Sequence, residues 1–276
     1  MDRELSTMAK PILPDKLWEI IGPLLPSLPS PNPKGGRPPL GNRQALTGIL
    51  FVLKTGMGWE DLPCELGCGS GMTCWRRLRD WQADGTWEKI HRELLGRLRG
   101  ADKIDWSRAL IDSSSVRAAY GGEETGPSPV DRAKSGSKHH VITDANGIPL
   151  TSSVTAANVH DVTEFAPLVN KLPEVAGKVG HPRRKPDALQ GDLAYDSEPH
   201  RQGLREMGIE PVLPEREIDD QQGLGETRWP VERTLAWFHQ NRRLRIRYER
   251  RVDIHQAFLT LACIKICASA LLGGLC

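Results

Sequence analysis

Three acidic residues stand where a carboxylate is energetically costly, and they are the side chains of this chain best suited to chemistry. Asp112 follows the apolar run 109–111, and Asp192 ends the mostly apolar run 188–191. Glu232 lies early in an arginine-rich segment with a helical pattern. A carboxylate at a buried strand position is unfavourable unless it is paired or binds a metal. Together the three acids suggest a divalent-metal site that faces a polyanion.

The segment that carries these acids, residues 105–272, alternates strand and helix patterns. The order of these elements is that of a ribonuclease-H-like α/β domain, a mixed sheet flanked by helices. In such a sheet the first and fourth strands are neighbours, so Asp112 and Asp192 should meet. The pattern predicts strands at 108–117, 138–143, 149–155, 187–191 and 209–213, and helices at 161–171, 197–207, 230–241 and 253–272.

Carboxylate oxygens without histidine ligands favour magnesium, with manganese as a substitute, and fit zinc poorly. Two Mg²⁺ ions held by the three acids could activate a water or a 3′-hydroxyl and stabilise the leaving oxygen of a phosphodiester. Each acid alone also has a structural interpretation. Asp112 could brace a turn, Asp192 could cap the next helix, and Glu232 could pair with Arg228 or Arg233.

Residues 1–100 read as an all-α domain. A helix near 43–54, a Gly-containing turn and a basic helix near 73–83 resemble a helix-turn-helix DNA-binding module. A small helical bundle with a basic surface fits the same pattern. The basic positions of the second helix are Arg76, Arg77 and Arg79.

Positive charge is concentrated locally, because the whole chain of 276 residues has a net charge of only +2. Residues 225–251 contain eight arginines and three glutamates. Residues 71–100 contain seven Lys or Arg against four Asp or Glu. Such clusters suit a phosphate backbone, and a solvated helix face is the alternative.

The cysteines and the apolar segments indicate where the chain works. Six cysteines do not form a disulfide pattern, and no signal peptide precedes them, which favours a reducing bacterial cytoplasm near the nucleoid. Cys64, Cys68 and Cys74 lack a fourth ligand for structural zinc. The apolar run 257–272 carries Lys265, so we expect a packed core helix and no membrane span.

Short motifs recur along nearly the whole chain. They include Gly35-Gly36-Arg37-Pro38, Arg76-Arg77-Leu78-Arg79-Asp80-Trp81, Ile111-Asp112-Ser113-Ser114-Ser115, Gly136-Ser137-Lys138-His139-His140, Ala157-Asn158-x-His160-Asp161, Gly191-Asp192-x-Ala194-Tyr195-Asp196-Ser197 and Trp229-x-Val231-Glu232-Arg233-Thr234. In order and spacing they resemble bacterial insertion-sequence transposases of the DDE type, in the IS4/IS5-type group.

The resemblance implies that Asp112, Asp192 and Glu232 are the catalytic, metal-binding triad. It implies binding to the terminal inverted repeats of an insertion sequence, magnesium-dependent strand cleavage, and strand transfer into target DNA by a homodimer on double-stranded DNA. His239 stands where the related pattern often has lysine. The expected DNA-binding residues are Arg228, Arg233, Arg242, Arg243, Arg245, Arg247, Lys138, Arg76, Arg77 and Arg79.

Two other functions remain open from the sequence. A nuclease or junction resolvase would use the same fold to cut DNA without joining it. An inactive, transposase-derived protein such as a repressor would bind DNA without cutting it.

Overall fold

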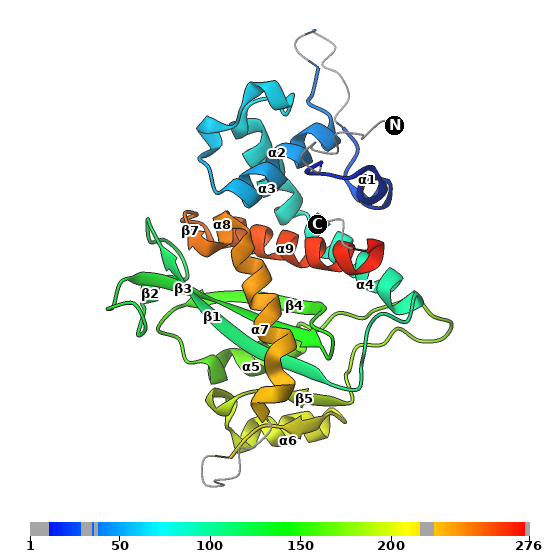
Figure 1. The fold of residues 1–276 in the computed structure, drawn as a ribbon, viewed down its shortest axis with the longest axis vertical. Helices are drawn as coiled ribbons and strands as arrows, with labels where there is room; N and C mark the ends of the chain where they lie inside the picture. The colour runs from blue at the N-terminus through cyan, green and yellow to red at the C-terminus, as the bar shows by residue number, and fades with distance from the viewer. Residues whose placement is uncertain (1–10, 29–34, 36–37, 216–223, 274–276) are drawn as a thin grey trace, which may run out of the picture.

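The computed structural model describes residues 11–28, 35, 38–215 and 224–273, in which a helical N-terminal part lies over the C-terminal helices, and these helices flank a mixed sheet (Figure 1). The described residues before Ala109 are helical or irregular, as the sequence predicts. Their helices are α1 (Asp15–Ile21), α2 (Asn42–Thr55), α3 (Gly71–Ala83) and α4 (Thr86–Gly100).

The connection between α2 and α3 differs from the expected helix-turn-helix. Residues 56–70 contain two 3₁₀ turns, Trp59–Asp61 and Cys64–Leu66. A helix-turn-helix joins its helices by about three or four residues. The short turn expected here is therefore replaced by a longer connection that contains two 3₁₀ turns.

The sheet has the predicted strand order. Its path runs β4–β3–β1–β5–β6, with β2 beside β3 and β7 beside β1. Strand β1 is antiparallel to β3 and parallel to β5. The strands are β1 (Ala109–Ala118), β2 (Gly126–Pro127), β3 (Ser135–Asp144), β4 (Pro149–Ala156), β5 (Ala188–Gln190), β6 (Glu210–Val212) and β7 (Ile246–Arg247).

Helix α7 begins earlier than the sequence predicts. It starts at Leu224, so Pro230 lies inside the helix and not in its first turn. The residues before Pro230 lack an apolar periodicity, and for this reason the pattern did not predict a helix there. The short elements β2, β7 and α8 were also not expected. The other helices of this part are α5 (Asp161–Asn170), α6 (Glu198–Glu206), α7 (Leu224–Gln240), α8 (Arg242–Arg245) and α9 (Val252–Leu272).

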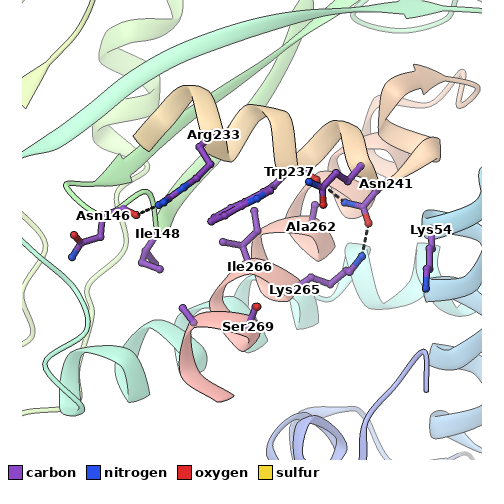
Figure 2. Close-up of a pocket in the computed structure, with 12 residues that line it drawn as sticks. Lys54, Asn146, Ile148, Arg233, Trp237, Asn241, Ala262, Lys265, Ile266 and Ser269 are labelled. Atoms are coloured by element: carbon purple, nitrogen blue, oxygen red, sulfur yellow. Dashed lines mark hydrogen bonds between the residues drawn. The ribbon is translucent and has the colours of Figure 1, made fainter. Parts of the chain in front are cut away.

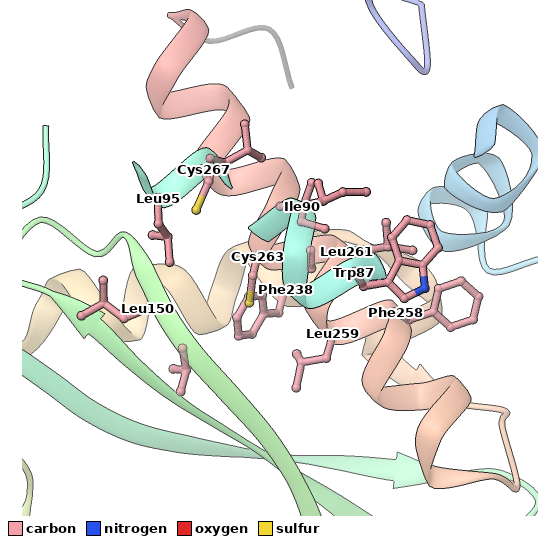
Figure 3. Packing of buried hydrophobic residues seen from close by; sticks show 14 of the residues in the cluster. Trp87, Ile90, Leu95, Leu150, Phe238, Phe258, Leu259, Leu261, Cys263 and Cys267 are labelled. Carbon is pink, nitrogen blue, oxygen red and sulfur yellow. The ribbon is translucent and has the colours of Figure 1, made fainter. Parts of the chain in front are cut away.

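One hydrophobic core joins the two parts of the chain. Helix α9 packs between α4 and the sheet, with Trp87 and Ile90 of α4 near Phe258 and Leu261 of α9 (Figure 3). Among the described helices, α9 is the one long and apolar enough to cross a membrane, and 67% of its most apolar stretch is buried in the protein. The expected core helix is therefore confirmed, and α9 joins α4 to the sheet.

A buried ion pair fastens the N-terminal part to the segment after α8. Arg243 donates from Nε to Glu249 Oε1 over 2.7 Å and from Nη1 to the carbonyls of Gly56 and Met57. Gly56 has a φ of 75°, and a Cβ there would lie 2.9 Å from the Cβ of Arg242. The close approach of the two segments thus requires glycine at this position.

Removing the carboxylate of this pair should destabilise the protein strongly. The Arg243 and Glu249 side chains are 8% and 4% exposed, so Glu249→Ala leaves an unpaired buried guanidinium. We expect a loss of about 3–5 kcal/mol in the free energy of unfolding, measured by urea denaturation. Glu93→Ala, which breaks the exposed Arg97–Glu93 pair, should cost below about 1 kcal/mol. Equal effects of the two variants would contradict the role of the buried pair.

Candidate active site

The pairing of β1 with β5 brings the two strand aspartates together. Ala109 pairs with Leu189 and Leu110 with Gln190 in parallel register. Continued by two residues, this register places Asp112 beside Asp192. Paired residues of neighbouring strands lie about 5 Å apart and point to the same face. The predicted proximity of these two carboxylates therefore follows directly from the sheet.

A guanidinium occupies the space between the two aspartates. Arg228 Nη2 lies 3.1 Å from Asp112 Oδ2 and 3.7 Å from Asp192 Oδ2. The Arg228 and Asp112 side chains are 17% and 15% exposed, and that of Asp192 is 33% exposed. Screening by solvent is incomplete at this depth, so the positive charge of Arg228 offsets much of the repulsion between the carboxylates.

Helix α7 carries the third acid, Glu232, to the neighbourhood of the two aspartates. It crosses the face of the sheet and contacts β1 (Figure 1). Thr234 Oγ1 donates to the carbonyl of Gly147 over 2.6 Å, which fixes the helix to the turn between β3 and β4. Glu232 is exposed on this helix, and its negative charge contributes to raising the pKa of Asp112.

Asp112 is the electrostatically strained member of the triad. Burial raises its pKa from 3.8 to about 6, and the charges of Asp192 and Glu232 act in the same direction. The backbone N–H of Ser113, which donates to Oδ1 over 2.8 Å, and Arg228 lower it in part. This is the behaviour expected of a carboxylate that is largely removed from water, with the nearby like charges as a smaller contribution.

The three predicted acids lie in the same region of the protein but do not form a metal-binding arrangement. Hard carboxylate oxygens from Asp112, Asp192 and Glu232 suit magnesium or manganese. Nevertheless, no three His, Cys, Asp or Glu side chains among the described residues are placed to hold one ion, which also gives no support to a zinc site at the cysteines. The donor set therefore fits a divalent metal, whereas Arg228 stands between two of the donors.

The Lys138 side chain is mostly buried, and its ammonium group binds to other residues of the protein. Its Nζ lies 3.1 Å from Asp161 Oδ1 and donates to the carbonyl of Val159, and the side chain is 11% exposed. Ser113 Oγ also donates to Asp161 Oδ1, over 2.8 Å. The predicted DNA contact of Lys138 is thus replaced by a role in joining β3 and β1 to the start of α5.

Two of the predicted DNA-binding arginines face the interior, and this corrects the sequence interpretation. Arg247 is fully buried and donates to the carbonyls of Glu123, Glu124 and Glu249. Arg243 forms the buried pair described above. The sequence could not show that these two arginines are buried, because a guanidinium donates hydrogen bonds equally well to a phosphate and to backbone carbonyls.

The remaining predicted arginines lie nearer the surface. Arg242 and Arg245 of α8 are exposed, and so is Arg76 of α3. Arg77 donates to Asn42 Oδ1 and to the carbonyl of Leu40, and Arg79 pairs with Asp80 at 2.7 Å. Hence Arg76, Arg242 and Arg245 are the members best placed for an external phosphate.

Tyr195 belongs to the site although the sequence did not single it out. Burial raises its pKa well above the ordinary value, and the charges of Asp161, Asp112 and Asp192 add to the effect. The phenol is therefore neutral beside the acids. Tyr195 lies in the 3₁₀ turn Leu193–Tyr195. Its position three residues after Asp192 is the sequence feature that could have identified it as part of the site.

His239 lies close to β1, the strand that carries Asp112. Its Nε2 is 3.3 Å from Ser114 Oγ, two residues beyond Asp112 on β1. Burial lowers the pKa of His239, so the imidazole is neutral at pH 7. A neutral ring here cannot supply the positive charge that a lysine would bring.

Comparisons with known proteins match both parts of the chain. A family model described as "Putative transposase of IS4/5 family" matches residues 13–91, and one described as "Transposase DDE domain" matches residues 107–266. The protein "Putative transposase for insertion sequence element IS402" of Burkholderia cepacia is 51% identical over 172 residues, which are 62% of this chain and 81% of that protein.

A second protein of Burkholderia cepacia, "Insertion element IS402 uncharacterized 16.2 kDa protein", is 62% identical over 126 residues, 44% of this chain and 84% of that protein. Among solved structures, "Crystal structure of the Mos1 Strand Transfer Complex" covers 87% of this chain and 81% of that chain, at 14% identity and a TM-score of 0.27. A TM-score this low supports no conclusion about fold or function.

Neutralising Asp112 should stabilise the fold at neutral pH. Its folded-state pKa of about 6 lies above the ordinary value of 3.8, so ionisation costs stability; the cost is absent below pH 3.8 and complete above pH 6. We expect Asp112→Asn to raise the free energy of unfolding at pH 7.5 by on the order of 1–3 kcal/mol.

Urea denaturation at pH 7.5 and pH 4 measures this effect, and the difference from wild type should shrink at pH 4. Asp80→Asn, at an exposed acid of α3, serves as the control and should change stability little at either pH. A destabilised Asp112→Asn protein at pH 7.5 would show that the carboxylate is held favourably and not under strain.

Proposed function

The chain belongs to the DDE transposases of the IS4/5 family, and we propose that it binds the terminal inverted repeats of an insertion sequence and catalyses metal-dependent strand cleavage and strand transfer. The observation that carries this proposal is the parallel register of β1 and β5, which sets Asp112 beside Asp192 under α7. The strand order supports assigning the catalytic part to the ribonuclease-H-like folds.

Asp112, Asp192 and Glu232 are the residues that would hold two Mg²⁺ ions, or Mn²⁺ in their place. When bound, these ions supply activation of a water or a 3′-hydroxyl and stabilise charge at the attacked phosphorus. Binding by all three acids requires Arg228 to leave the space between the aspartates and Glu232 to approach them. The guanidinium of Arg228 would then be available to donate to a phosphate oxygen of bound DNA.

The surroundings of the triad support a polyanionic substrate. Arg242 and Arg245 expose positive charge on α8, the short helix that follows α7. Arg76 exposes positive charge on α3. These side chains would hold the DNA backbone and carry no sequence information. Binding to DNA should therefore weaken steeply as salt is raised. Joining two element ends calls for two copies of the chain, and we propose a homodimer on DNA.

The catalytic proposal is tested with a precut element end that carries a free 3′-hydroxyl, supplied with a supercoiled plasmid target and Mg²⁺. The wild-type protein should join the end to the plasmid. Asp112→Asn, Asp192→Asn and Glu232→Gln should each lower joining at least about a hundredfold, because each removes a ligand from the site that stabilises transition-state charge.

Glu206→Gln, at an exposed acid near the end of α6, is the matched control and should join at the wild-type rate. Cleavage without joining would support the nuclease or resolvase alternative. DNA binding with neither reaction would support an inactive, transposase-derived binding protein.

Removing the guanidinium should strengthen metal binding in the absence of DNA. Arg228→Ala deletes a positive charge 3.1 Å from one ligand and 3.7 Å from another. At the dielectric of a partly buried site this is worth enough to raise Mn²⁺ affinity roughly tenfold. Electron paramagnetic resonance of free Mn²⁺ during a titration measures the affinity directly.

Arg245→Ala, which removes an exposed arginine from α8, is the control and should leave Mn²⁺ affinity nearly unchanged. Equal or weaker Mn²⁺ binding by Arg228→Ala would show that Arg228 does not compete with the metal.

A further inference from the structure

A large aromatic side chain lies exposed beside the predicted catalytic acid of α7. Trp229 is 54% exposed, although a tryptophan side chain usually buries roughly 150–250 Å² of surface on folding. It lies three residues before Glu232 and directly after Arg228, whose guanidinium contacts Asp112 and Asp192. The exposed indole is therefore a neighbour of the predicted active site along the same helix.

Trp229 lies within the exposed stripe of α7. Successive residues of a helix are rotated by about 100°, since 3.6 residues make one turn. The exposed residues of α7 whose side chains the structure describes are Glu232, Ala236, Trp229 and Gln240, at about 40°, 80°, 100° and 120° from Arg228. A DNA strand that reaches Glu232 from solvent therefore meets Trp229 on the same face of the helix.

The indole is supported on one face by Arg233. The centre of the Arg233 guanidinium lies 4.5 Å from the ring of Trp229 and 4.5 Å from the ring of Trp237. Figure 2 shows Arg233 and Trp237 next to each other along α7, with Nη2 of Arg233 donating to the carbonyl of Asn146. One face of the Trp229 ring is thus covered by a held side chain, and the exposed surface of the indole is its opposite face and edge.

A held, half-exposed ring is suited to stacking on a nucleic-acid base. Every base has a flat π face, so stacking on an aromatic side chain tolerates different sequences. A side chain that is already held in place loses less conformational entropy when it binds. The Arg233 guanidinium behind the ring adds positive charge that attracts a polyanion.

The spacing between Trp229 and Glu232 limits which base the indole can reach. The Cβ atoms of residues three apart on a helix are about 5–6 Å apart. Neighbouring nucleotides of one strand are about 3.4 Å apart along the duplex axis. When a phosphate lies at the triad, the indole therefore reaches bases up to about two nucleotides away.

We propose that Trp229 stacks on a DNA base within about two nucleotides of the phosphate attacked at the triad, with Arg233 supporting the ring from behind. This role rests on the proposed function, because it requires DNA at the triad. The base is one at or next to the cut end, where a face is free of its neighbours in the duplex. Stacking holds the adjacent phosphodiester in position for the reaction.

Binding of a precut element end without a target plasmid tests the proposal, because this readout requires no joining. Fluorescence anisotropy of the labelled end gives the affinity, for the intact end and for ends with an abasic site at each nucleotide near the cut. Trp229→Ala should weaken binding of the intact end at least about fivefold. For the end that is abasic at the stacked position the loss should be below about twofold, since both changes remove the same contact.

Two further substitutions of Trp229 separate stacking from simple apolar contact. Trp229→Phe keeps a ring and should bind the intact end within about threefold of wild type, whereas Trp229→Leu has no ring and should resemble Trp229→Ala. Gln240→Ala, at another exposed position of α7, is the matched control and should bind every end as wild type does.

Equal weakening of the intact end and of every abasic end by Trp229→Ala would show that the ring acts only through the protein, and would overturn the proposal. Unchanged binding by Trp229→Ala, or wild-type affinity of Trp229→Leu, would overturn it as well. The catalytic proposal fails separately, if wild type binds the end with the expected loss in Trp229→Ala but does not join it to a plasmid. A wild-type protein that binds no element end would contradict both proposals.

Discussion

The burial of one carboxylate, Asp112, beside a second one, Asp192, is the constraint on which the rest of the site depends. The parallel register of β1 and β5, continued two residues past its last pair, leaves Asp112 beside Asp192. Burial raises the pKa of Asp112 to about 6, which means that ionising this carboxyl group costs free energy in the folded protein. Arg228 offsets part of this cost, because its guanidinium contacts both carboxylates. A functional site that destabilises the fold is held by the surrounding packing.

That packing comes from both ends of the sequence. Helix α4 lies against α9, and Arg243 links the segment after α8 to the carbonyls of Gly56 and Met57. Helix α7 is fastened to the turn between β3 and β4 by Thr234. Helix α7 is therefore held at a fixed position beside Asp112 and Asp192.

Much of the site could be predicted because it depends on local pattern and strand order. Apolar runs that end in Asp112 and Asp192 marked the two strands, and the order of elements made those strands neighbours. Side-chain partners could not be predicted in this way. The sequence gives no sign that Arg247 turns inward to cap carbonyls or that Lys138 pairs with Asp161, because these contacts join residues distant in the chain. The contact of Arg228 with both aspartates is of the same kind.

We propose that Arg228 and a divalent ion are alternative occupants of one position between Asp112 and Asp192. Anomalous diffraction from crystals of the protein soaked with Mn²⁺ tests this most directly, since it locates the ion and shows the arginine in one experiment. We predict a manganese peak bound by both aspartates, with the guanidinium of Arg228 moved out of contact with their oxygens. A peak elsewhere in the protein, or manganese bound at these aspartates while Arg228 keeps its contacts, would contradict the account.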